Sequence, residues 1–181
     1  MDKQIVKFDM CEMEYKGSLL NSDLPVRLFE QKYYEKYKKL INSCFYEMRK
    51  ELNIHPYGEF CANLEELINQ QGSIFLLLNG DEIIAAVSCF ENEISKVAVN
   101  LKYQRHGYGR KIMEFAISYI QRNCNSPIEL TVAKWNKKAI HLYKSLGFEV
   151  AKETTVEGVS TKDTNGNWTF KFISTNGLSI S

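Results

Sequence analysis

The sequence predicts an α/β fold, with helices on both faces of a mixed, mostly antiparallel central sheet. Apolar, β-rich runs joined by short turns indicate an antiparallel meander between residues 73 and 99. A helical pattern at 107–121 then separates two strand patterns, which makes a βαβ unit and hence one parallel strand pair. The chain has 181 residues and no Pro/Gly/Ser-rich linker, so we expect one domain over 1–181.

The N-terminal part is expected to hold one strand and two helices. Residues 4–10 have the pattern of a short strand. Pro25 suits the first position of a long helix, and apolar residues recur at helical spacing from Tyr34 to Leu52. Asn63 is suited to cap a second helix that runs to Gln71.

The rest of the chain alternates between strands and helices. Strands are expected at 73–78, 83–90, 94–99, 128–132, 148–156 and 168–173, and helices at 107–121 and 136–145. Asn136 is suited to cap the last helix, and Gly147 to end it. The polar segment 157–167 is expected to be a loop, and the uncharged tail 174–181 to fray.

Composition excludes several classes of protein. Apolar residues make up 44% and charged residues 25%, which is ordinary for a globular domain, and a formal net charge of +1 is too small for a general nucleic-acid or membrane binder. No apolar run is long enough to cross a bilayer. The first ten residues lack the basic and apolar regions of a signal peptide, so we expect a cytoplasmic protein.

The cysteines and histidines do not have the spacing of a metal site. The five cysteines are far apart in sequence and form no CxxC pair, and the three histidines are not clustered with them. We therefore expect reduced thiols and no bound metal.

Charge is segregated along the chain. Residues 51–95 contain eight acids and no Lys or Arg, whereas residues 96–113 contain five bases and no acid. The basic stretch covers a predicted strand end, a glycine-containing loop and a predicted helix start. Unpaired backbone amides and the helix dipole favour anions at such a place, so we expect it to bind a group such as a pyrophosphate.

The glycine loop itself does not match the common nucleotide-binding motifs. It has the sequence Gln104-Arg105-His106-Gly107-Tyr108-Gly109. A dinucleotide fingerprint needs a third glycine where Ile112 stands, and the chain has no Gly-Lys-Ser/Thr of a P-loop.

The loop does resemble the Q/R-x-x-G-x-G/A signature of the GCN5-related N-acetyltransferase (GNAT) family. A second segment, from Asn136 to Phe148, resembles the N-x-x-A-x-x-L-Y-x-x-x-G-F signature of the same family. The two segments occur in the family's order. The resemblance implies the GNAT fold, a coenzyme-binding core at about 73–148, acetyl-coenzyme A (acetyl-CoA) as co-substrate, and an amine acceptor bordered by the helices of 1–72.

The resemblance also assigns residues to the coenzyme. Main-chain amides of 105–110 would hold the pyrophosphate, and Asn136 would bond the pantetheine while it caps its helix. Val97 lies in the family's splayed strand, whose main chain pairs with the pantetheine arm. The residues assigned to coenzyme binding are Val97, Ala98, Val99, Gln104, Arg105, His106, Gly107, Tyr108, Gly109, Arg110, Asn136 and Tyr143.

Two side chains are expected to be catalytic. In the family, the tyrosine at the position of Tyr143 protonates the leaving thiolate, and a general-base glutamate occurs at the position of Glu93 in the histone-acetylating branch. Glu91 and a water relay remain alternatives as the base. The branch that acetylates ribosomal protein N-termini has its acid at the position of Thr131, which does not support that variant here.

The sequence therefore predicts an N-acetyltransferase in which a primary amine attacks acetyl-CoA directly. A coenzyme-binding module without catalysis is the alternative. We expect no nucleic-acid or membrane partner. The acceptor, a small molecule or a peptide amine, and the oligomeric state stay open, because no motif addresses them.

Overall fold

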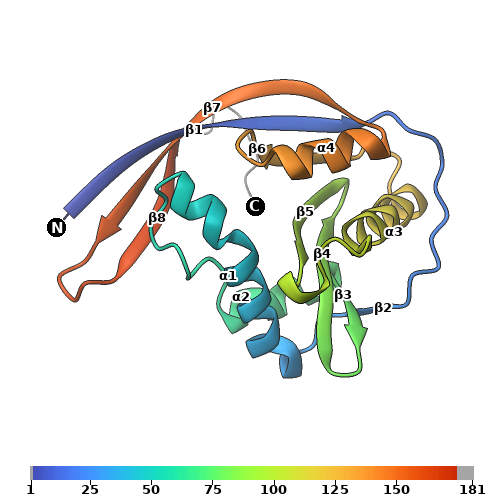
Figure 1. Ribbon diagram of the computed structural model, residues 1–181, viewed down its shortest axis with the longest axis horizontal. Coiled ribbons are helices and arrows are strands. Elements are labelled where there is room, and N and C mark those ends of the chain that lie inside the picture. The colour runs from blue at the N-terminus through green and yellow to red at the C-terminus, as the bar shows by residue number, and fades with distance from the viewer. Residues whose placement is uncertain (1, 175–181) are drawn as a thin grey trace.

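The computed structural model describes residues 2–174, within which eight strands form one sheet in the order β2-β3-β4-β5-β6-β1-β7-β8 (Figure 1). The strands are β1 (Asp2–Tyr15), β2 (Val26–Leu28), β3 (Ile74–Asn79), β4 (Glu82–Phe90), β5 (Glu93–Val99), β6 (Glu129–Ala133), β7 (Phe148–Lys162) and β8 (Trp168–Ser174). The α-helices are α1 (Tyr34–Glu51), α2 (Leu64–Asn69), α3 (Tyr108–Asn123) and α4 (Lys137–Leu146).

The predicted fold class is confirmed. Among the described strands, β5 and β6 are parallel and all other neighbouring pairs are antiparallel. The helix α3 connects the two parallel strands, so β5, α3 and β6 form the predicted βαβ unit.

Helices cover both faces of the sheet. On one face, α3 and α4 pack over a core that includes Ile112, Ile117 and Tyr143. On the other face, α1 and α2 pack over a second core that includes Tyr37 and Leu67. The sheet is therefore the middle of three layers, and its strand ends are the places that a ligand can reach between the layers.

The first strand differs most from its prediction. The structure extends the expected strand 4–10 to Asp2–Tyr15 and places it between β6 and β7. It pairs with β7 over its whole length and with β6 over residues 10–14. Local periodicity predicts that a segment is a strand, but it carries no information on which distant strands will be its neighbours.

The helix expected to begin at Pro25 begins at Tyr34 instead. Pro25 precedes β2, a short edge strand that pairs with β3. Proline suits the start of an edge strand as well as the start of a helix, so this residue alone did not separate the two. The helical periodicity beyond Tyr34 is confirmed, because Tyr37 and Ile41 of α1 are buried.

The ends of the later elements agree closely with the predictions. Asn63 caps α2 in a capping box with Glu66, and Gly147 ends α4 in the left-handed conformation with a φ of 105°. The loop expected at 157–167 is shorter, because β7 continues to Lys162. Of the tail expected at 174–181, Ser174 ends β8 and residues 175–181 lie outside the described part.

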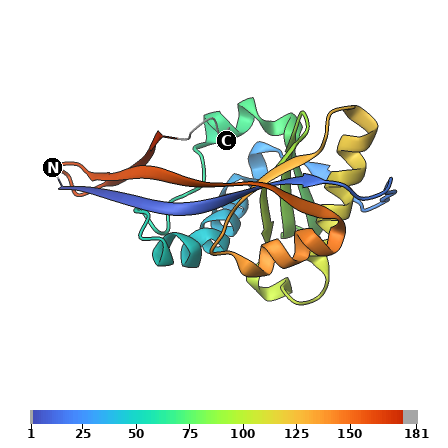
Figure 2. The same ribbon diagram turned by 90° about the horizontal axis from the view of Figure 1, so that it is seen from above.

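The strands β1, β7 and β8 extend together beyond the rest of the sheet (Figure 2). Under this extension is a third, smaller core, in which Phe8 and Val156 pack with Ile54 from the segment after α1. Phe170 and Phe172 of β8 pack against the same cluster. The extension therefore reaches over the C-terminal end of α1, and it forms part of the pocket described below.

All five cysteines are free thiols, two of them buried and three half-buried. Among residues 2–174, no group of His, Cys, Asp and Glu side chains is arranged to hold a metal ion. Within the same range, no helix combines the length and the apolar character needed to span a membrane.

Candidate active site

A β-bulge bends β5 at Lys96. The register of β5 against β4 shifts there, so that residues 96–97 oppose Val87 alone. Lys96 has a φ of 49°, in the left-handed region. Because of the extra residue, Ile94 packs into the core beneath α3 whereas Ala98 packs into the core beneath α1.

The parallel strands β5 and β6 separate after two paired positions. Glu93 pairs with Glu129 and Ile94 with Leu130, and these are the register pairs of the two strands in the described chain. The bulge follows directly, so the rest of β5 diverges from β6. The backbone groups of residues 95–99 that face β6 therefore have no ladder partner. The carbonyl oxygen of Val99 accepts hydrogen bonds from the side chains of Gln104 and Cys44, and the other groups need a partner from a ligand or from water. This opening is suited to a molecule that pairs with β5 as a strand does.

A glycine begins the helix that follows β5. Gly107 is the N-cap of α3 with a φ of 81°, and no side chain caps that end of the helix in the described part. Arg105 is also left-handed, with a φ of 65°, and the Nδ1 atom of His106 lies 2.7 Å from the carbonyl oxygen of Gln104. The first backbone amides of a helix have no partner within it, so they and the helix dipole favour a bound anion.

The second glycine of the loop lies against the neighbouring helix. A Cβ atom on Gly109 would be 3.4 Å from the Cδ2 atom of Leu142 in α4 and 3.8 Å from the Cγ2 atom of Val99. The loop thus lies between the end of β5 and α4, with little space for a larger side chain. This position brings the open helix end next to the opening between β5 and β6.

The basic side chains near this helix end already have partners. Arg110 donates a hydrogen bond to the Oγ atom of Ser145 at 2.7 Å and lies 3.8 Å from the carboxylate of Glu114. The Nζ atom of Lys111 lies 5.3 Å from the ring centroid of Tyr108. The backbone amides, rather than these two cations, are therefore the groups most available to an anion here.

Asn136 is the N-cap of α4, and Tyr143 lies within that helix. The Oδ1 atom of Asn136 accepts a hydrogen bond from the amide of Ala139 at 3.1 Å, which confirms the predicted helix cap. Tyr143 is 8% exposed, and burial raises its pKa to about 12. The phenol therefore keeps its proton at neutral pH, which is the state of a proton donor.

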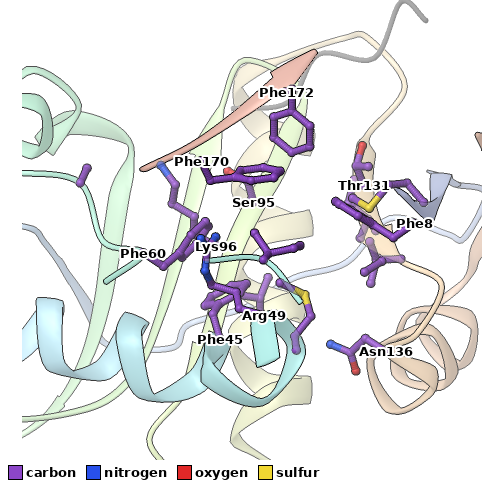
Figure 3. Close-up of a pocket in the computed structure, with 18 of the residues that line it drawn as sticks. Phe8, Phe45, Arg49, Phe60, Ser95, Lys96, Thr131, Asn136, Phe170 and Phe172 are labelled. Atoms are coloured by element: carbon purple, nitrogen blue, oxygen red, sulfur yellow. The ribbon is translucent and has the colours of Figure 1, made fainter. Parts of the chain in front are cut away.

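A pocket of about 620 Å³ connects these elements (Figure 3). Of the predicted site residues, Glu93, Val97, Asn136 and Tyr143 line it, whereas Ala98, Val99 and the loop 104–110 do not. Figure 3 shows Phe45, Phe60 and Arg49 on one side of the pocket, Phe8, Thr131 and Asn136 on the other, and Phe170 and Phe172 of β8 along the top.

The two candidate general bases both line a second, smaller hollow, but only Glu93 also lines the large pocket. Glu93 lines the pocket beside the bulge. Glu91 lies in the turn before β5 with a φ of 51° and lines the smaller hollow together with Glu129. Thr131 of β6 lines both hollows. A hydroxyl group therefore occupies the position that the resemblance gives to a catalytic acid in the branch that acetylates ribosomal proteins. The geometry favours Glu93 over Glu91 as a group near the pocket.

Sequence reasoning missed several residues that line the pocket. Arg49 and Phe45 come from α1, Phe8 from β1, and Phe170 and Phe172 from β8. None of them belongs to a motif. Arg49 is buried, which is unusual for a charged residue on an amphipathic helix. The sequence does not indicate this burial, because it depends on how distant segments pack around the third core.

A mixed sheet whose parallel pair diverges at a bulge, next to a glycine-started helix, defines a class of acyl-coenzyme A-dependent transferases. The chain belongs to the acetyltransferase (GNAT) family, whose model matches residues 34–148. The predicted family is thereby confirmed. Members of this family use acetyl-CoA as the acetyl donor.

Curated relatives are named as amine acetyltransferases. Over 112 residues the chain is 31% identical to the [ribosomal protein bS18]-alanine N-acetyltransferase of Escherichia coli, a match that covers 59% of this chain and 73% of that protein. Over 112 residues it is 28% identical to N-alpha-acetyltransferase 30 of Homo sapiens, and that match covers 56% of this chain and only 29% of the human protein.

Solved structures share the fold. A GNAT-family structure from Novosphingobium aromaticivorans superposes with a TM-score of 0.64 at 16% identity, over 87% of this chain and 66% of that one. The ribosomal-protein-S18-alanine N-acetyltransferase from Escherichia coli superposes with a TM-score of 0.52 at 22% identity, over 86% of this chain and 97% of that one.

Proposed function

We propose that this protein transfers the acetyl group of acetyl-CoA to a primary amine by direct attack, without an acyl-enzyme. One observation carries the proposal: Glu93 and Tyr143, from different elements, line the same pocket at the point where β5 and β6 diverge. A base and an acid are the two groups that amine acetylation requires.

The residues around the opening fit the coenzyme. The unpaired amides of 105–110 and the positive end of α3 suit the pyrophosphate. The main-chain edge of Val97, Ala98 and Val99, which has no register pair with β6, suits the amides of pantetheine, because both are strings of hydrogen-bonding groups. Asn136 is placed to bond the same arm from α4.

The chemistry assigns one proton to each catalytic side chain. The acceptor loses its ammonium proton to Glu93, directly or through water, because an amine whose pKa is near ~10 is mostly protonated at neutral pH. The amine nitrogen then forms a bond to the thioester carbon, and the bond from that carbon to sulfur breaks. Tyr143 donates its proton to the departing thiolate. The nitrogen loses its second proton as the amide forms, and this proton restores the Tyr143 phenol directly or through water, while Glu93 releases the first proton to solvent.

Direct transfer agrees with where the thiols lie. Among the cysteines, burial raises the pKa of Cys44 and Cys61 to about 11 and that of Cys89 to about 12, which keeps all three protonated and weakly nucleophilic. No cysteine lines the pocket in the described part of the chain. An acyl-cysteine therefore has no suitable nucleophile there.

The names of the relatives bear on which of the open acceptors to test. Two of them act on the α-amine of a protein, a ribosomal protein in one case. Small amines, antibiotics, peptide N-termini and lysine side chains are all acceptors to test. The relatives favour peptide N-termini, although Thr131 replaces the acid that the resemblance assigns to the ribosomal branch.

The test is release of free thiol from acetyl-CoA, measured with a panel of such acceptors. An N-acetyltransferase releases thiol and acetylated product in equal amounts, and only when an acceptor is present. A module that only binds the coenzyme would bind acetyl-CoA in calorimetry and release no thiol with any acceptor, which would overturn the proposal in favour of the second function.

A further inference from the structure

Arg49 is a buried cation that has no carboxylate partner among residues 2–174. The exposed fraction of its side chain is 5%. Within residues 2–174, no carboxylate oxygen of Asp or Glu lies within 4.0 Å of a guanidinium nitrogen, the distance that defines an ion pair. Burial lowers its pKa to about 10, so the guanidinium still carries its charge at neutral pH.

The contacts of Arg49 compensate for only part of this burial. Its Nε atom donates a hydrogen bond to the carbonyl oxygen of Pro56 at 2.7 Å. Its guanidinium carbon lies 5.1 Å from the ring centroid of Phe60 and 5.8 Å from that of Phe170, so both rings contribute cation–π attraction. A guanidinium has five N–H donors, and the described chain provides an acceptor for one of them.

The remaining donors belong to the pocket. Arg49 lines it, and Figure 3 shows the residue on the same side as Phe45 and Phe60. A buried charge is costly unless it is paired and hydrogen-bonded. The two terminal nitrogens of an arginine match the two oxygens of a carboxylate in a bidentate pair. The pocket is therefore built to receive an anionic group at this point.

The other lining residues describe the rest of the ligand. Phe8, Phe170 and Phe172 make much of the wall apolar and aromatic. Glu59 and Glu66 also line the pocket, and neither is within ion-pair distance of Arg49. The pocket thus presents an anion-binding group, an apolar wall and separate carboxylates that suit an ammonium group.

From this arrangement we propose that Arg49 binds a carboxylate of the acceptor, and that the acceptor is a primary amine with an aromatic or large apolar body and a carboxylate. This inference rests on the proposed acetyltransferase function and adds the substrate class to it. The carboxylate belongs either to a free amino carboxylate or to an acidic side chain next to a peptide N-terminus.

The experiment compares two acceptors of nearly equal shape. We use 4-(aminomethyl)benzoate and 4-(aminomethyl)benzamide, which have the same amine and ring and differ in the carboxylate. Their kcat/KM is measured with the wild type, with Arg49→Met, which keeps an apolar stem against the phenylalanines, and with Arg49→Lys. Lys50→Met removes an exposed cation from the next position of α1 and is the control.

We expect the wild type to prefer the benzoate by at least about tenfold, because a hydrogen-bonded charge pair contributes that much or more. Arg49→Met should remove the preference by raising KM for the benzoate and leave kcat/KM for the benzamide within about threefold. Arg49→Lys should retain part of the preference, and Lys50→Met all of it.

Equal losses for both acceptors in Arg49→Met would show that Arg49 only supports the segment around Pro56, and would overturn the inference. A second pair of acceptors consists of peptides with Asp or Asn as second residue. A wild type that distinguishes neither the two small acceptors nor the two peptides would also overturn the inference. A preference seen only for the Asp peptide would assign the carboxylate to a peptide side chain.

Binding measurements separate this inference from the proposed function. If no acceptor supports thiol release, calorimetry with 4-(aminomethyl)benzoate in the presence of coenzyme A still tests Arg49. Binding that is at least about tenfold weaker in a folded Arg49→Met or Arg49→Lys variant would support the inference while the catalytic proposal fails. Equal binding to all variants would reject the inference.

Discussion

The side-chain amide of Gln104 donates a hydrogen bond from Nε2 to the main-chain carbonyl oxygen of Val99, at 3.1 Å. The thiol of Cys44 donates to the same oxygen at 3.2 Å from α1. The end of β5 is thereby tied both to the glycine loop and to the helix on the opposite side of the sheet. One carbonyl group thus links the glycine loop to α1, which forms part of the wall of the large pocket.

The glycine loop leads to the first prediction. Gly107→Val should weaken acetyl-CoA binding at least about tenfold, because it adds a branched side chain at the helix end and strains a backbone with a φ of 81°. A Cβ atom at this position meets no protein atom within 4 Å, so the loss would come from the ligand and the backbone rather than from a clash inside the fold.

Gly80→Val is the matched control for this variant. Gly80 is also left-handed, with a φ of 58°, has no atom within 4 Å of its Cβ position, and lies in the turn between β3 and β4. Calorimetry should give wild-type affinity for Gly80→Val. Unchanged affinity in a folded Gly107→Val variant would remove the loop from the coenzyme site.

The second prediction concerns Tyr143. Tyr143→Phe should lower kcat by about 100-fold or more with little change in coenzyme affinity, because the loss affects proton donation in the transition state. Tyr119→Phe, on α3 against Phe75, is the control and should keep full activity. Full turnover by Tyr143→Phe, or an acetyl-cysteine trapped on the enzyme, would contradict the mechanism.

The pH dependence of kcat provides a third test. Because burial raises the pKa of Tyr143 to about 12, the protonated donor persists as the pH rises and is lost only near that value. Between about pH 7 and about pH 10, kcat of the wild type should therefore show no decline from loss of the phenol proton. A fall in kcat centred near the ordinary tyrosine pKa, absent from Tyr143→Phe, would contradict this assignment.

The fourth prediction separates the two candidate bases. Glu93→Gln should lower kcat/KM by about 100-fold at neutral pH, with a smaller deficit at high pH where more of the amine is already deprotonated. Glu91→Gln should stay within about threefold of the wild type, because Glu91 does not line the pocket of Tyr143. If Glu91→Gln has the larger effect, Glu91 is the base and the assignment of that role to Glu93 is wrong.

The fifth prediction follows from the segregated charges. Three acids of the acidic stretch, Glu59, Glu66 and Glu93, line the pocket. Lys96 is the base of the basic stretch that lines it, and the rest of that stretch leads to the start of α3. An acceptor that carries an ammonium group should therefore have a lower KM than a matched neutral amine, and the difference should shrink as salt rises. A preference for neutral acceptors, or no salt effect, would contradict it.

The sequence determined much of the coenzyme side because its signals are local. Gly107 has a positive φ that few other residues adopt, Asn136 caps a helix that begins at the next residue, and the meander strands alternate with clear turns. These features depend on neighbours within a few positions, so motif, turn and helix could be predicted together.

The tertiary structure decided which side chains form the large pocket, although the family resemblance already implied that the helices of 1–72 border the acceptor. A strand at 2–15 could be predicted only in part, and its place between β6 and β7 depends on pairing with residues more than a hundred positions away. That pairing positions Phe8 across the pocket from Arg49, and β8, which pairs with β7, brings the ring of Phe170 to 5.8 Å from the guanidinium carbon. From the sequence alone, Arg49 looks like an ordinary charged residue of an amphipathic helix. Side chains from distant segments form this pocket, and no local pattern records which segments will meet.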